Sequence, residues 1–148
     1  MNRFSMLVGL LAAVLTAPAA AAPPPAWKAN CQVCHQTDGQ GLAGQFPRLA
    51  GRTAVIAAKP AGRAYLAAVV TNGLAGRIIV DGTPIIGVMP GFGTLSDSDL
   101  AAALSFAARG GTAAPFKPAE IAAARKAPMK NSAMTELRAR LIADGTIP

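Results

Sequence analysis

The chain has 148 residues, and its 14 Lys and Arg against 7 Asp and Glu give a formal net charge of +7 at pH 7. That length suits one domain, and a single His with two Cys excludes a tetrahedral zinc site built from four such ligands. The basic residues are scattered along the chain, so the charge favours acidic protein partners over nucleic acid, with membranes reached only peripherally through those partners.

The N-terminus has the features of a secretory signal peptide. A basic start at Arg3 is followed by an apolar run over residues 4–15, which is shorter than the ~20 residues that a membrane span requires. Small residues at Ala19 and Ala21 suit a cleavage site. We therefore expect residues 1–21 to be removed and the protein to be periplasmic; the alternative is an uncleaved anchor.

A Cys-x-x-Cys-His motif comes soon after this segment. Its residues Cys31, Cys34 and His35 occupy positions i, i+3 and i+4, which share one face of a helix. Each thiol can form a thioether with a haem vinyl group, and the imidazole can then ligate the iron. A redox dithiol is the alternative, but it typically opens a helix after a strand, whereas this motif follows prolines at 23–25.

The pattern around the motif predicts a helix over 27–35 and a Gly-rich loop over 36–44. Pro47 follows His35 at the twelfth position, so its carbonyl can return and accept a hydrogen bond from the imidazole. Such a bond would orient the ring as a ligand. A simple proline-led turn is the alternative.

Further elements follow in chain order. A short helical segment is expected over 51–59, closed by Pro60, and a longer helix over 62–71. The Asp-Gly pair at 81–82 lies between two apolar runs and predicts a small β-hairpin over about 77–86.

Met89 lies in a Gly- and Pro-rich segment over 87–92 that we expect to be a loop. Ordinary core packing explains a methionine there poorly, whereas a thioether is a suitable soft sixth ligand for haem iron. His35 is the only histidine, which excludes ligation by two histidines of one chain. The other methionines lie in the signal segment or the C-terminal tail, namely Met1, Met6, Met129 and Met134.

The C-terminal part is predicted to be helical. Ser96 caps a helix that extends to 109, and the tail over 112–148 contains two more helices, at 119–126 and 132–143. The last helix has an apolar stripe formed by Met134, Leu137, Leu141 and Ile142. We expect the tail to pack back on the preceding domain; the alternative is a loosely held segment for partner docking.

Taken together, these motifs resemble the class I, single-haem cytochromes c, most closely the cytochrome subunits and domains that serve bacterial periplasmic dehydrogenases. The resemblance covers about residues 27–110. The motifs that carry it are Cys31-x-x-Cys34-His35, Phe46-Pro47-Arg48-Leu49-Ala50-Gly51, the Asp81-Gly82 hairpin, Gly87-Val88-Met89-Pro90-Gly91-Phe92 and Leu95-Ser96-Asp97.

The resemblance implies an all-α class I fold around one covalent haem c, bound through Cys31 and Cys34. It implies His35 and Met89 as axial ligands. Arg48 would lie near a haem propionate. The implied organisation is a cytochrome c domain at 22–111 and a C-terminal helical extension at 112–148.

The implied function is one-electron transfer from a dehydrogenase to an oxidase or another cytochrome. No carboxylate pair, Ser-His-Asp set or phosphate-binding loop is apparent in the sequence, so we predict a non-enzymatic role. The alternative is a haem c enzyme or a gas or redox sensor whose sixth ligand is labile. A thiol–disulfide oxidoreductase remains a third class, and it requires both cysteines to be free.

Overall fold

The computed structural model describes residues 22–148, so the predicted signal peptide lies outside the described residues. The described chain is mostly helical, with one two-stranded antiparallel sheet. In chain order, the helical elements are the π-helical turn η1 (Trp27–Cys31), α1 (Gln32–His35), α2 (Arg52–Ala57), α3 (Pro60–Asn72), α4 (Asp97–Ala107), α5 (Pro118–Lys126) and α6 (Asn131–Ala143), and the strands are β1 (Leu74–Val80) and β2 (Thr83–Met89). Within residues 22–148, no helix is long and apolar enough to cross a membrane.

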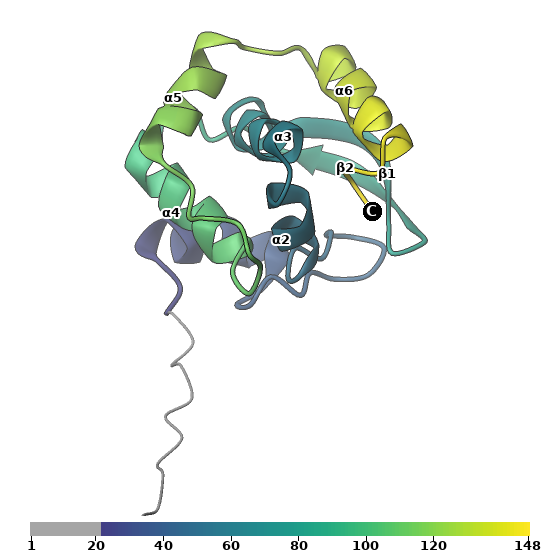
Figure 1. Ribbon diagram of the computed structural model, residues 1–148. Helices are drawn as coiled ribbons and strands as arrows, with labels where there is room; N and C mark the ends of the chain where they lie inside the picture. The colour runs from purple at the N-terminus through teal and green to yellow at the C-terminus, as the bar shows by residue number, and fades with distance from the viewer. Residues whose placement is uncertain (1–21) are drawn as a thin grey trace, which may run out of the picture.

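Helix α3 lies at the centre of the molecule (Figure 1). Helices α4 and α5 cover one side of it, α6 lies beside the hairpin, and α2 lies below. The segment that carries the Cys-x-x-Cys-His motif runs along the bottom of this view. The motif thus lies at the edge of the molecule, whereas α2, α4, α5 and α6 all contact the central helix α3.

The hairpin is longer than the sequence predicts. Its ladder runs from Leu74 paired with Met89 to Val80 paired with Thr83, instead of over about 77–86. The predicted turn is present at 81–82, where both residues have positive φ angles of 51° and 75°. Met89 is therefore the last residue of β2, and our expectation that it lies in a loop was wrong.

Helix boundaries differ from expectation at Pro60. We expected this proline to close a helix, but it begins α3 at the first turn, where a missing N–H costs no hydrogen bond. The predicted cap at Ser96 is confirmed, because its Oγ accepts a hydrogen bond from the backbone N–H of Asp99 at 3.1 Å.

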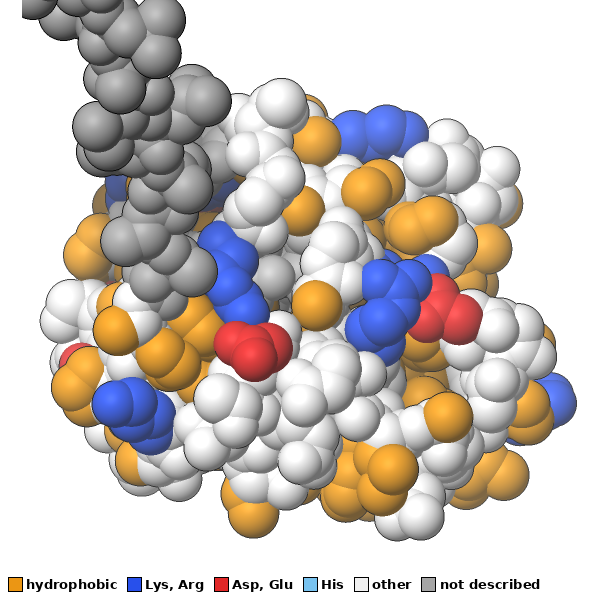
Figure 2. Space-filling view, turned by 90° about the horizontal axis from the view of Figure 1, so that it is seen from below, with side chains coloured by type: hydrophobic (Ala, Val, Ile, Leu, Met, Phe, Trp, Pro, Cys, Tyr) orange, Lys and Arg blue, Asp and Glu red, His pale blue; other side chains and the backbone are white. Residues whose placement is uncertain are grey.

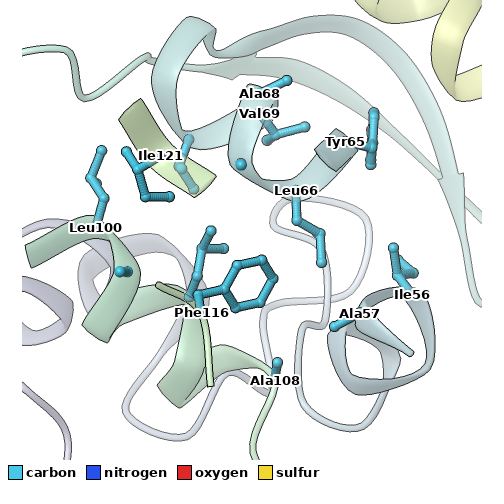
Figure 3. Close-up of a cluster of buried hydrophobic side chains, with 14 of the residues drawn as sticks. Ile56, Ala57, Tyr65, Leu66, Ala68, Val69, Leu100, Ala108, Phe116 and Ile121 are labelled. Carbon is cyan, nitrogen blue, oxygen red and sulfur yellow. The ribbon is translucent and has the colours of Figure 1, made fainter. Parts of the chain in front are cut away.

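The C-terminal tail packs back on the rest of the molecule. Ile121 of α5 and Met134 of α6 are completely buried, and both belong to the same apolar cluster as Leu66 of α3. Figure 3 shows Ile121 beside Leu100, with Phe116 on the side towards Leu66. The extension therefore contributes to the main core.

Candidate functional site

The Cys-x-x-Cys-His motif spans the end of η1 and all of α1. Trp27, only 1% exposed, fixes this segment. Its ring lies 4.9 Å from that of Phe106 on α4, and its indole N–H donates to the carbonyl of Thr37 at 3.0 Å. One side chain thus ties the motif helix to α4 and to the loop that follows.

His35 is buried and makes the hydrogen bond that its spacing from Pro47 suggested. Its Nδ1 lies 2.9 Å from the carbonyl oxygen of Pro47. Because a carbonyl only accepts, Nδ1 carries the hydrogen and Nε2 keeps its lone pair for a metal. Burial lowers the pKa of His35, partly offset by the bond to Pro47, so the imidazole is neutral at pH 7.

Gly41 allows the loop to bring Pro47 to the histidine. Its φ angle is +68°, and a Cβ built there would lie only 2.5 Å from the carbonyl oxygen of Phe46. Its N–H donates to the carbonyl of His35 at 3.1 Å. The close approach is therefore between two segments of backbone, which only glycine permits.

The two cysteines are free and half-buried. Burial, and then the neighbouring Cys34, raises the pKa of the Cys31 thiol to about 11. Thiol–disulfide oxidoreductases use a cysteine whose pKa is lowered, so this environment disfavours the dithiol interpretation. In the described part of the chain, no group of three or more His, Cys, Asp and Glu side chains is placed to hold a metal ion.

Met89 is half-buried at the end of β2 and packs against the main apolar cluster. Two glycines fix the backbone around it. A Cβ at Gly73 would lie 2.6 Å from the carbonyl oxygen of Met89, and a Cβ at Gly91 would lie 2.7 Å from that of Thr71. Cys31, by contrast, packs on the second cluster, formed around Trp27.

Arg48 forms a two-pronged ion pair with Asp81 at the hairpin turn, with N–O distances of 2.7 and 2.8 Å. Nearby lie Arg52 and Arg138, both buried, which the sequence analysis did not single out. A signal was present for Arg138, since it follows Met134 by one helical turn on the apolar stripe of α6. A charged residue on a buried stripe generally has a specific partner.

A known protein family matches more than half of the chain. The family model described as "Cytochrome C oxidase, cbb3-type, subunit III" matches residues 18–106. The chain belongs to this cytochrome c family. Membership implies a haem c, and the residues present fit one: two free thiols and a neutral imidazole with one nitrogen available.

Three individual proteins are similar to this chain over 77 or 84 residues. Two sequences named cytochrome c-552, both from Thermus thermophilus, are 49% identical over 77 residues, which is 52% of this chain and 59% or 52% of theirs. The "Alcohol dehydrogenase (quinone), cytochrome c subunit" of Gluconobacter oxydans is 37% identical over 84 residues, or 55% of this chain and 16% of that protein. The alignments with the first two thus span little more than half of each relative.

Proposed function

We propose that the protein is a periplasmic one-electron carrier, or the electron-transfer subunit of a larger complex, with a class I cytochrome c fold around one covalent haem c. The observation that carries this proposal is the Cys-x-x-Cys-His motif, whose imidazole is held by the carbonyl of Pro47 with Nε2 left free. The predicted export signal supports the location, because haem is joined to such motifs outside the cytoplasm.

The chain would hold the haem through four residues. Cys31 and Cys34 would supply the two thioether bonds, and their free thiols suit this role. His35 and Met89 would be the axial ligands, one neutral and oriented by Pro47, the other a soft thioether that raises the reduction potential. When bound, the haem supplies an iron that alternates between the ferrous and ferric states.

Burial around the ligands supports a carrier over an enzyme. His35 is only 6% exposed, so the protein would keep water away from the histidine side of the haem. The backbone carbonyl of Met89 lies close against Gly73, and the partly buried residue packs against the main apolar cluster. Such fixed ligands keep the reorganisation on electron transfer small, whereas an enzyme or sensor requires a sixth ligand that leaves readily.

We further propose redox proteins as partners, with a dehydrogenase as donor and an oxidase or another cytochrome as acceptor. The printed name of the Gluconobacter relative supports the donor. After removal of the signal peptide, which contains Arg3, 13 Lys and Arg against 7 Asp and Glu leave a formal charge of +6, which would attract an acidic partner surface. Figure 2 shows the molecule from below relative to Figure 1. On this face, Lys and Arg side chains lie beside acidic ones, with apolar side chains spread between them.

An absorption spectrum of the full chain, produced in a host that matures haem c, tests the proposal. We expect a low-spin spectrum with the weak long-wavelength ferric band of iron–methionine ligation. Met89→Ala should abolish that band, while the matched control Met129→Ala, in the C-terminal extension, should keep it.

Two outcomes contradict parts of the proposal. A high-spin spectrum that shifts readily with carbon monoxide would mean an open iron, and would favour a haem enzyme or gas sensor. A purified protein whose mass lacks a covalent haem would contradict the haem assignment itself.

A further inference from the structure

The ligand loop, residues 90–96, joins Met89 to helix α4. Two of its N–H groups donate to backbone carbonyls: Phe92 donates to α3 at 2.8 Å, and Leu95 donates to Phe92 at 3.2 Å. In the described part of the chain, the carbonyls of Gly93 and Leu95 accept no hydrogen bond from a backbone N–H. The loop therefore depends on a side chain for these two acceptors.

Arg125, in the last turn of α5, supplies the donors. Its Nη1 donates to the carbonyl oxygen of Gly93 at 2.6 Å, and its Nη2 donates to that of Leu95. Its Nε donates to the carboxylate of Asp97, the first residue of α4, at 2.6 Å. One guanidinium thus spans the second half of the loop, and all three of its nitrogen atoms donate.

An arginine suits this task because its guanidinium is planar and presents its donors in a fixed fork. The side chain of Arg125 is 26% exposed and that of Asp97 is 33% exposed, so solvent reaches both only in part. Hydrogen bonds from a charged donor are also stronger than those between neutral groups. The three bonds therefore restrain the loop against α5.

Helix α5 is a fixed support for this contact. It belongs to the C-terminal extension and begins beyond residue 106, where the family match ends. Its residue Ile121 is completely buried in the main apolar cluster. In Figure 1, α5 lies beside α4, and it also contacts α3. Arg125 thus connects a helix of the buried core to the segment that directly follows Met89.

Met89 itself lies at the junction between the hairpin and the ligand loop. On the hairpin side it is restrained by its pairing with Leu74 of β1. A methionine held in this way can move away from an iron chiefly when the loop on its other side moves. Contacts that hold the loop therefore act on the methionine.

We infer that Arg125 is a positioning residue for Met89. By restraining the loop, it keeps the thioether on the iron and opposes replacement of the methionine by another ligand. The C-terminal extension thereby serves the redox site as well as the core. This inference rests on the proposed function, because it requires Met89 as an axial ligand.

The first test measures how readily imidazole displaces the methionine in the ferric, haem-loaded full chain. Loss of the long-wavelength iron–methionine band reports the displacement. Arg125→Gln should raise the apparent affinity for imidazole about tenfold, which matches the loss of roughly one or two net hydrogen bonds. Arg125→Lys keeps the charge beside Asp97 but not the planar fork, so it should raise the affinity less.

The control is Arg63→Gln, which removes the same charge from an arginine that fastens α5 elsewhere. Arg63 donates to Glu120 and to the carbonyls of Ala114 and Pro115, and its guanidinium lies 4.1 Å from the centre of the Phe116 ring. None of these partners lies in the ligand loop. The control should loosen α5 but change the affinity for imidazole by less than about twofold. Equal increases in the two Gln variants would overturn the inference, because general loosening of α5 would explain both.

Hydrogen exchange of the same proteins, followed by mass spectrometry, gives a readout that does not depend on the iron. Arg125→Gln should speed the exchange of the Phe92 and Leu95 amides, whereas Arg63→Gln should not. Unchanged exchange of these amides in Arg125→Gln would also overturn the inference. Should Arg125→Gln not fold, Arg125→Lys is compared with Arg63→Lys by both measurements.

Failure of the proposed function gives a different result from failure of this inference. An unmodified, haem-loaded protein without the iron–methionine band would contradict the ligand role of Met89, and this inference with it. A normal band in the unmodified protein, together with equal imidazole affinities of the two Gln variants, contradicts this inference alone.

Discussion

The motif segment, residues 27–50, and the C-terminal extension, residues 112–148, are held in different ways. The motif segment is held by one buried side chain, Trp27, and in the rest of its length by backbone contacts, such as the Leu49 N–H donating to the carbonyl of Gly39 at 2.7 Å. The extension depends on side chains without exposed surface, such as those of Ile121 and Met134. We therefore expect the stability of the extension to depend most on the volume of its buried side chains. We expect the stability of the loop in the motif segment to depend most on glycines, which allow close backbone contacts.

The largest effect is expected for Met134→Ala in the extension. This side chain is 0% exposed in the main cluster, so truncation should leave a cavity and lower the free energy of unfolding by about 2–5 kcal/mol. Ile142→Ala, on the same helix but with a residue 49% exposed, should cost under about 1 kcal/mol. Urea unfolding followed by circular dichroism measures both, and equal losses would mean that the extension is only loosely docked.

A somewhat smaller effect is expected for Gly41→Ala in the motif segment. A Cβ there would overlap the carbonyl oxygen of Phe46, and the alanine would have to adopt a left-handed φ angle. We therefore expect the free energy of unfolding to fall by about 2–3 kcal/mol. Gly44→Ala is the matched control, because its φ is +76° but no atom lies within 4 Å of its Cβ. It should cost about 1 kcal/mol, from the φ angle alone.

The readout for the glycine pair is thermal unfolding together with the ferric spectrum. If Gly41→Ala displaces Pro47 from His35, the spectrum should change along with the melting temperature. Equal melting temperatures for the two variants would show that the close approach at Gly41 is unimportant.

The sequence predicted those features of the fold whose signals are local. Local patterns carry their own signals: the Asp-Gly turn predicted the hairpin, and Ser96 predicted the start of α4. The boundaries were missed where the ladder includes Gly76 and Gly87, which have low strand propensity but pair in register. At Pro60, the same residue type can end one helix or begin the next, and only the three-dimensional context decides.

In the candidate site, too, the contact within one loop was predicted and the contact between distant elements was not. The spacing of His35 and Pro47 lies within one loop, so their contact could be suggested from sequence, and the structure contains it. The meeting of Arg52 with Arg138 could not, because it requires α6 to fold back over the hairpin. The ligand roles of Cys31, Cys34, His35 and Met89 stay predictions that the spectrum will test.

The smallest expected effect concerns an ion pair that joins the extension to α3. Arg63 donates two hydrogen bonds of 2.8 Å to the carboxylate of Glu120. The bond from Arg63, more than any other contact, lowers the pKa of this carboxylate below its ordinary value of 4.5. Because the folded-state pKa is the lower one, the pair stabilises the protein above about pH 4.5 and loses its effect as the pH falls through the folded-state pKa.

Glu120→Gln should therefore lower the free energy of unfolding by about 0.5–1 kcal/mol at pH 7, discounted because the side chain is partly exposed. Gln keeps one acceptor oxygen for the backbone N–H of Lys117 but has an NH2 donor in place of the other oxygen, so the loss reports the charge together with one hydrogen bond from Arg63. The difference between the two proteins should vanish at acid pH, where the native carboxyl is protonated. Glu136→Gln, at an exposed position of α6, is the control. A loss that persisted unchanged at acid pH would show that packing of α5, and not the ion pair, carries the effect, which would make even this surface contact depend on side-chain volume.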